Sequence, residues 1–419
     1  MNVAGLSVSF LFPVEEETSS RLMKRSHLLG VVVWWFGVLV VMCTAELLPK
    51  GFSSSLIMPR RNHGCVVSQE SDRQVAYLIG GRFAASVESL DMKTNSHRLV
   101  VPHHPLLDVN HMAVELVPSL ANPSQQEIWV MCGFRGADFG EQKPMDHLVI
   151  IDTSNWKVRK GPSIDRPRGA CTSHQFDGPI SGDFNFATVP TRPPNDPSQV
   201  IKGRLVCLLG GLLGTHDEGH SSARFSCWDR LKRKWIQLPD LHSPLDHHNS
   251  VLVRRRTCPA QPRDAILVFN GRSGEYGESS PVIRQLTLGD AKWKTWPEHF
   301  HAPFSAAAVT LSPTGKMVSF GGIDYSAGRE IKSVRTNEIH LFDVCSRRSC
   351  TARTTLAVQK WAIFPCQYDT SDHLTICGGD SLMGDANSNH PYCETFDLTA
   401  IEKECDGRWL AAEDQKRRS

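Results

Sequence analysis

Six short apolar runs that end in glycine recur along this chain, and this repetition constrains the fold more than any other feature. The last glycines of successive runs are 52, 78, 60, 51 and 57 residues apart. Each run mixes β-branched and aromatic residues without a helical period, which predicts a buried strand that stops at a residue free to adopt a positive φ. The runs are VAYLIGG (75–81), IWVMCG (128–133), RLVCLLGG (204–211), AILVFNG (265–271), MVSFGG (317–322) and LTICGG (374–379).

The residues around each run repeat as well. A shorter apolar segment precedes the run, and a polar loop with a further strand follows it. A last strand often opens with tryptophan, as at Trp156, Trp235, Trp293 and Trp409. Four short strands in each of six units predict an all-β chain, folded as a six-bladed β-propeller with four antiparallel strands per blade. The 31 glycines and 25 prolines then serve as turn residues.

The order of residues within a unit resembles the kelch repeat of the galactose oxidase and kelch-like superfamily. Two units carry the resemblance most clearly, MPRRNHGCVV…VAYLIGG…SLD and RPRGACTS…RLVCLLGG…CWDRLKRKW. It spans residues 58–412 and implies that each repeat is one blade of a closed ring. Cys132 and Asn270 depart from the pattern, because they replace the first glycine of the second and fourth repeats.

The sequence divides into four segments. Residues 1–45 form an N-terminal leader, 46–57 a linker, 58–412 the propeller and 413–419 a polar tail. Two long insertions, 177–203 in the third blade and 254–264 in the fourth, are expected between the first and second strands of those blades.

The leader contains an uncharged apolar run, residues 28–45, preceded by Lys24 and Arg25. Read from Met23, it has the pattern of a signal peptide cleaved after Ala45. Read from Met1, it is a signal anchor, a single transmembrane helix oriented by the preceding basic residues. Either interpretation directs the chain to the secretory pathway, as a secreted or single-pass membrane protein with its propeller on the lumenal or extracellular side.

The cysteine count agrees with this compartment. Thirteen cysteines less Cys43 of the apolar run leave an even number, which suits disulfide formation under oxidising conditions. Three pairs have hairpin spacing, although spacing alone does not fix connectivity and buried free thiols are the alternative. The candidate pairs are Cys345 with Cys350, Cys366 with Cys377, and Cys393 with Cys405.

The net charge of the chain limits the classes of molecule that it is expected to bind. The chain has 46 Lys and Arg against 44 Asp and Glu, which gives a formal net charge of +2. Proteins that bind nucleic acid usually carry an excess of basic residues, and this chain as a whole has none. We therefore expect no nucleic-acid partner, and contact with a membrane only through the N-terminal apolar segment.

Candidate binding residues gather at one end of the predicted ring. In a four-stranded blade, the segment that enters the first strand lies on the same face as the loop after the second strand. Polar loop residues and several histidines, His63, His174, His247 and His248 among them, should therefore surround one mouth of the channel. This favours a non-catalytic binding module for a protein or glycan ligand, with a pH response through histidine. The candidate residues are Arg82, Arg135, Asp138, His216, Asp217, Arg272, Tyr276, Asp324, Tyr325 and Asp380.

Two enzyme classes are the alternatives. A six-bladed secreted kelch architecture also resembles the sialic-acid mutarotases, for which Arg82, Arg135 or Arg272 with Glu275 would supply a carboxylate-binding and acid–base set. Copper-radical oxidases need two histidines and two tyrosines around copper, and the few tyrosines here have unsuitable positions. We therefore expect no metal, no cofactor and no catalytic residue.

Overall fold

The structure is a computed structural model, and it divides the chain into two compact units, Met1–Pro49 and Lys50–Ser419. All described residues belong to the second unit, so the apolar segment 28–45 and the tail 413–419 lie outside them. Among the described residues, no helix is long and apolar enough to cross a membrane. The described residues are 51–70, 72–136, 142–179, 200–215, 219–258, 261, 263–273, 278–300, 306–324, 334–367, 372–380 and 390–411.

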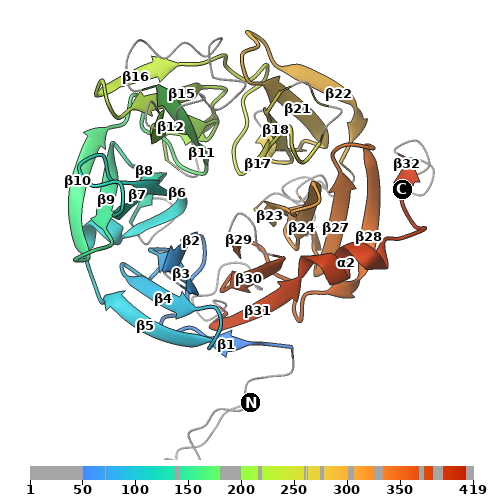
Figure 1. The fold of residues 1–419 in the computed structure, drawn as a ribbon, viewed down its shortest axis with the longest axis horizontal. Coiled ribbons are helices and arrows are strands. Elements are labelled where there is room, and N and C mark those ends of the chain that lie inside the picture. Colours follow the sequence, from blue (N-terminus) through green and yellow to red (C-terminus); the bar gives the residue numbers. More distant parts are fainter. Residues whose placement is uncertain are drawn as a thin grey trace, which may run out of the picture. The chain divides into compact units, whose positions relative to one another are not determined.

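Six antiparallel sheets follow one another around a ring (Figure 1). The first blade is β2 (Gly64–Glu70), β3 (Arg73–Ile79), β4 (Val87–Asp91) and β5 (Ser96–Val101), and the second is β6 (Val109–Pro118), β7 (Gln126–Arg135), β9 (His147–Asp152) and β10 (Lys157–Ser163). The third is β11 (Thr172–Pro179), β12 (Val200–Leu209), β15 (Phe225–Asp229) and β16 (Lys234–Gln237). The fourth is β17 (Asn249–Val253), β18 (Ala265–Phe269), β21 (Val282–Thr287) and β22 (Lys294–His299). The fifth is β23 (Ala308–Leu311), β24 (Lys316–Phe320), β27 (Glu338–Asp343) and β28 (Arg348–Thr355), and the sixth begins with β29 (Phe364–Gln367), β30 (His373–Cys377) and β31 (Tyr392–Asp397).

The six glycine-ended runs form the second strands β3, β7, β12, β18, β24 and β30, which confirms the predicted six-bladed β-propeller. Both long insertions lie between first and second strands, as expected. Residues 180–199, the greater part of the first insertion, are outside the described part of the chain.

The ring closes through its first residues. Strand β1 (Ser54–Ser55) pairs with β31, so that Ser54 stands opposite Cys393 and supplies the outer strand of the sixth blade. This corrects the expectation of a linker over 46–57, because part of that segment belongs to a sheet. A disulfide between Cys65 and Cys366 joins β2 of the first blade to β29 of the sixth. Blade one and blade six are therefore held together both by strand pairing and by a covalent bond.

The end of the described chain returns to the fifth blade. Helix α2 (Leu398–Glu404) follows β31, and Asp397 caps it by accepting a hydrogen bond from the Ala400 N–H. Strand β32 (Leu410–Ala411) then pairs with β28. Trp409, expected to open a last strand of the sixth blade, instead precedes β32, because β1 already occupies the free edge of β31.

All cysteines after Cys43 form disulfides, which indicates an oxidising compartment, extracellular or within the secretory pathway. The three predicted pairings are wrong. Cys366 stands opposite Thr375 rather than Cys377, and Cys345 lies in the turn between β27 and β28, the strand that carries Cys350. The bonds observed are Cys65–Cys366, Cys132–Cys171, Cys207–Cys227, Cys258–Cys345, Cys350–Cys405 and Cys377–Cys393.

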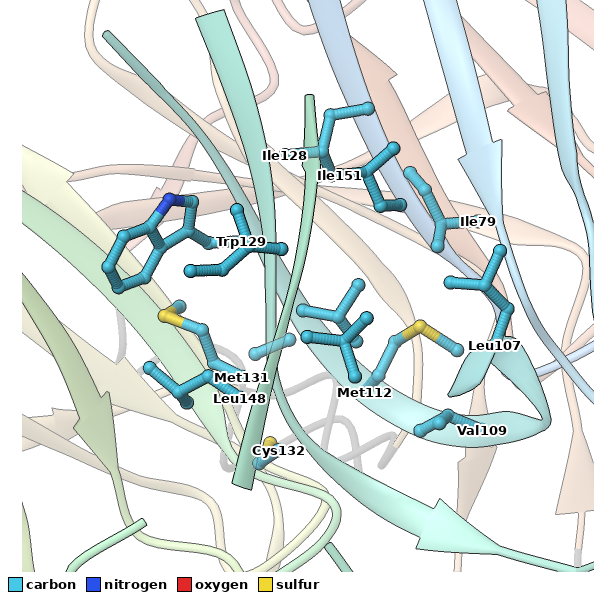
Figure 2. Close-up of a cluster of buried hydrophobic side chains, with 14 of the residues drawn as sticks. Ile79, Leu107, Val109, Met112, Ile128, Trp129, Met131, Cys132, Leu148 and Ile151 are labelled. Atoms are coloured by element: carbon cyan, nitrogen blue, oxygen red, sulfur yellow. The ribbon is translucent and has the colours of Figure 1, made fainter. Parts of the chain in front are cut away.

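The core lies largely between neighbouring blades. Figure 2 shows part of the cluster between the first and second blades, where Ile79 of β3 points toward Ile128 and Ile151. Tryptophans at the start of fourth strands contact the preceding blade. Trp156 packs edge-on against Tyr77 with ring centroids 5.0 Å apart, and the Trp235 indole N–H donates to the Ser163 carbonyl at 2.8 Å. These tryptophans therefore serve packing between blades.

The arginine of the Pro-Arg motif has a structural role. Arg60 is fully buried and donates to the Leu78 and Gly80 carbonyls at 3.2 and 3.0 Å and to the Glu88 carboxylate at 3.1 Å. Burial lowers the pKa of Arg60 to about 10, and the Glu88 charge opposes that shift. Arg168 takes the same place in the third blade, where it donates to Ser226 at 2.8 Å. In these two blades the motif thus satisfies buried polar groups at the ends of β3 and β12.

Candidate functional site

Six residues, one near the start of each first strand, form a closed circle of backbone hydrogen bonds at one mouth of the channel. Each adopts a left-handed conformation with φ between 49° and 56°. The N–H of each donates to the carbonyl of the equivalent residue in the preceding blade, over 2.9–3.4 Å. The circle links all six blades at the point where their strands begin. Its members are Asn62, His111, Ala170, His247, Ala306 and Ala362.

Two histidines of this circle touch. The rings of His111 and His247 meet edge to face with centroids 5.1 Å apart. Each Nδ1 is held by the side chain of the preceding residue, His111 by Asn110 at 2.7 Å and His247 by Asp246 at 2.6 Å. Burial, together with the charge of Arg272, lowers the pKa of His247, so its ring is neutral near pH 7.

Asp246 is the centre of a buried polar cluster at the mouth. Its carboxylate accepts hydrogen bonds from Arg272 Nε at 2.8 Å, from Ser221 Oγ at 2.6 Å and from His247. Burial alone would raise the pKa of Asp246, but these hydrogen bonds and the Arg272 charge outweigh it and hold the pKa well below its usual range. Asp246 therefore stays ionised and is unsuited to donate a proton.

A second ion pair crosses from the first blade to the sixth. Arg61 NH1 donates to Asp380 Oδ2, and both side chains are buried. The Arg61 carbonyl also accepts a hydrogen bond from the Arg82 N–H at 2.9 Å. Arg82 and Asp380 are thus connected through Arg61, although they are far apart in the sequence.

Two arginines that follow or end other second strands, Arg82 and Arg135, are only partly buried. Phe83 is 47% exposed, in a left-handed conformation with φ 68°, and the Arg82 guanidinium carbon lies 5.0 Å from its ring centroid. At the end of β7, half-buried Arg135 donates from NH2 to His147 Nε2 at 3.0 Å. Burial lowers the pKa of His147, the nearby Arg135 charge acts in the same direction, and Nδ1 of the neutral ring donates to Asp146.

The structure places only some of the predicted site residues. Arg82, Arg272 and Asp380 directly follow the glycines of three second strands and adjoin the segments that enter first strands. Asp324 ends the short strand β25 (Ile323–Asp324). The binding role of these residues stays a prediction. Asp138, His216, Asp217, Tyr276 and Tyr325 lie outside the described residues, as does Glu275.

Sequence reasoning missed Arg61, Asp246 and every circle residue except His247. The available signal was Asn or His at three of the six circle positions, since these residues are among the non-glycine types that most often adopt a positive φ. The other three positions are alanine, which gives no such signal. The ion-pair partners of Arg61 and Asp246 could not be predicted from the sequence, because each pair joins residues that are not neighbours in the chain.

Three histidines expected at the mouth are buried instead. His174 and His248 connect the first strands of the third and fourth blades, through Ser250 at 2.8 Å and Thr172 at 3.0 Å. A Cβ on Gly210 would lie 2.5 Å from Cε1 of His248, which explains the glycine there. Burial lowers the pKa of His248 and of His63 to about 3 and that of His174 to about 4. These residues are structural and not part of an exposed histidine ring.

The circle and the first strands enclose a cavity of about 240 Å³ in the channel. Within the described ranges, no group of three or more His, Cys, Asp and Glu is placed to hold a metal ion. All six blades contribute to the lining, which includes Asn62, His111, Ala170, His247, Ala306 and Ile363.

The blades, their order and the closed circle define a six-bladed β-propeller. No protein-family model matches the sequence, and no curated protein does. Among solved structures 398 chains match. One is the structure of YjhT, with a TM-score of 0.59 and 10% sequence identity, covering 81% of this chain and 95% of that one. At this identity the likeness establishes the fold alone.

Proposed function

We propose that this protein acts outside the cytosol as a non-catalytic binding module whose propeller mouth recognises a carboxylate-bearing protein or glycan ligand. The observation that carries the proposal is Arg135. Its guanidinium is bonded to the ring of His147, and among the described residues no carboxylate forms an ion pair with it. A half-buried arginine held by a neutral partner keeps donors for a ligand carboxylate.

The other charges of the mouth support binding over catalysis. Asp246 and Asp380 are each buried against an arginine, Arg272 and Arg61. An acid–base enzyme needs a group that exchanges protons near neutral pH, and the depressed pKa of Asp246 removes it from that role. Exposed Phe83 beside Arg82 adds an apolar contact of the kind that both sugars and peptides use.

The test uses the full chain and two matched ligand pairs. Sialyllactose is compared with lactose, and a glutamate-rich peptide with the same peptide carrying glutamine. We expect the carboxylate-bearing member of one pair to bind, and R135Q to weaken that binding by roughly ten- to hundredfold, since a hydrogen bond to a charged group contributes about 1.5–3 kcal/mol. The control R98Q removes an exposed arginine from the outer strand β5.

Equal binding of both members of a pair, unchanged binding by R135Q, or binding of none of the four ligands would each overturn carboxylate recognition here. Interconversion or cleavage of the bound sugar, followed by NMR, would replace the binding module with the alternative of a carbohydrate-acting enzyme.

A further inference from the structure

A strongly basic surface lies on the face opposite the mouth. In each antiparallel blade, the connections between first and second strands and between third and fourth strands share one end, and the connection between second and third strands lies at the other. In the third, fourth and fifth blades the former connections are crowded with exposed cations. We name this set the basic face: Lys232, Arg233, Lys234, Arg254, Arg255, Arg256, Arg263, Lys292, Lys294, Arg347 and Arg348.

Few acidic groups offset these charges. Arg254 pairs with Asp264, Lys294 with Asp290 and Arg347 with Glu298. In the part of the chain that the structure describes, the side chains of Arg233, Arg255 and Arg256 form no ion pair. Each cation that keeps no counter-charge adds to the positive potential of this surface.

The charge is segregated across this face. The corresponding connections of the first and sixth blades carry five acidic residues, Glu70, Asp72, Asp91, Asp372 and Asp397, against the two cations Arg73 and Lys93. The whole chain has a net charge of only +2, so the basic face is a local concentration and not a consequence of overall composition. A merely solvated surface would intersperse the two signs.

The basic face is also held in place. The Cys258–Cys345 disulfide joins the loop that carries Arg254–Arg256 to the turn that carries Arg347, with Cα atoms 5.5 Å apart. Arg256 and Arg347 are each two residues from that bond, so their Cα atoms lie within about 20 Å of each other. Arg254 is also close enough to the third blade for its charge to lower the pKa of His174. Cations of the fourth and fifth blades therefore form one connected surface, and Arg254 brings this surface close to the third blade.

We propose that the basic face binds a sulfated polysaccharide. Its cations follow successive blades, which suits a linear polyanion, and most are arginines, whose planar guanidinium bonds oxyanions with two parallel donors. The disulfides place the protein in an oxidising compartment, where such polymers occur and nucleic acid is not the expected polyanion. Leu231 is the one exposed large apolar side chain within the described basic connections, which leaves little apolar area for insertion into a bilayer.

The test measures retention of the full chain on immobilised heparin as sodium chloride increases. The triple variant R233Q/R255Q/R256Q removes three cations without breaking an ion pair of the described residues. The control K93Q/R98Q/K160Q removes the same charge from exposed positions on the first and second blades. We expect the wild type and the control to be retained at physiological salt, and the basic-face variant to elute earlier. Its slope of log affinity against log salt should be shallower by roughly 0.7–0.9 per cation removed, the value known for other polyanions.

Each other outcome overturns the proposal. Failure of the wild type to bind, or equal losses in both variants, would show that the basic face is not a site. Equal binding of desulfated heparin would exclude sulfate as the group recognised, and binding only to phosphatidylserine vesicles would assign the face to membranes. The R135Q variant of the mouth should keep its heparin affinity, so this test and that of the carboxylate site fail independently. Disulfide mass mapping and the unfolding midpoint verify that each variant is folded.

Discussion

Acid should destabilise this propeller well above the pH at which carboxylates titrate, because His63, His174 and His248 are buried as neutral rings. Burial is the main cause of all three pKa shifts, to about 3 for His63 and His248 and about 4 for His174. The charges of Arg60 and Arg254 assist at His63 and His174. An unfolded histidine titrates near pH 6.5. Between these values the unfolded chain binds protons that the folded protein does not.

The sign and size of the pH dependence of the unfolding free energy follow from this difference in proton binding. A lowered histidine pKa leaves stability complete above about pH 7 and removes it progressively as the pH falls below 6.5, down to the folded pKa. Between pH 7.5 and pH 5 each of the three histidines should cost about 2 kcal/mol of unfolding free energy, or about 6 kcal/mol together. Carboxylates with lowered pKa, such as Glu88, lose their contribution only near and below pH 4.5.

The assay is guanidinium unfolding under oxidising conditions, followed by tryptophan fluorescence and circular dichroism at pH 7.5, 6.5, 5.5 and 5.0. Near pH 5 the unfolding free energy should change by about 4 kcal/mol per pH unit. H174Q keeps a hydrogen-bonding group beside Ser250 and should reduce the loss between pH 7.5 and 5 by about 2 kcal/mol. H103Q, which replaces an exposed histidine, should leave the loss of unfolding free energy between pH 7.5 and 5 unchanged. An unfolding free energy that is flat between pH 7 and 5 would refute the neutral burial of these residues.

Two further predictions concern the ring. Replacing Cys65 and Cys366 by serine removes the disulfide between blades one and six, whose two cysteines are 301 residues apart in sequence. The unfolding free energy should fall by about 3–5 kcal/mol, because the disulfide closes a long loop in the unfolded chain. Serine at Cys207 and Cys227, only 20 residues apart, is the matched comparison and should cost less in the same denaturation experiment. A362G should raise the unfolding free energy by about 0.5–1 kcal/mol, since Ala362 has φ 56° and glycine relieves that strain. The same change at Ala352, within strand β28, should lower stability, and a loss at both positions would contradict the strain argument.

Much of the scaffold was predictable because it is encoded locally. Glycine pairs end four of the second strands and Asn270-Gly271 ends a fifth, so these strands and their order follow from the sequence. The exception is β7, which continues through Gly133 to Arg135. The ring closure was not predictable in the same way. Ser54 and Ser55 carry no strong strand signal, and they become a strand because the sixth blade has an open edge beside them.

The candidate site shows the same division between local and distant information. The position of Arg82, Arg272 and Asp380 after second strands follows from blade topology, whereas the pairing of Asp380 with Arg61 depends on the neighbouring first blade. Arg61 and Asp380 are 319 residues apart and meet only because the ring closes. The cysteine pairings failed for this reason as well, since hairpin spacing considers one blade while Cys65–Cys366 and Cys258–Cys345 cross between two.

The two faces of the propeller can therefore differ in function without any change in the blades. Buried charges within the blades and beside the backbone circle form ion pairs with one another, as Arg60 does with Glu88 and Arg61 with Asp380. The charged groups left for ligands are half-buried Arg135, at the mouth end of β7, and the basic face on the opposite side, whose cations lie in or beside the connections between strands. Substitutions in these connections should alter binding with little effect on stability, whereas those in the circle should do the reverse. If R135Q lowered the unfolding free energy as much as loss of a buried ion pair, about 3–5 kcal/mol, this separation of scaffold and binding surface would be wrong.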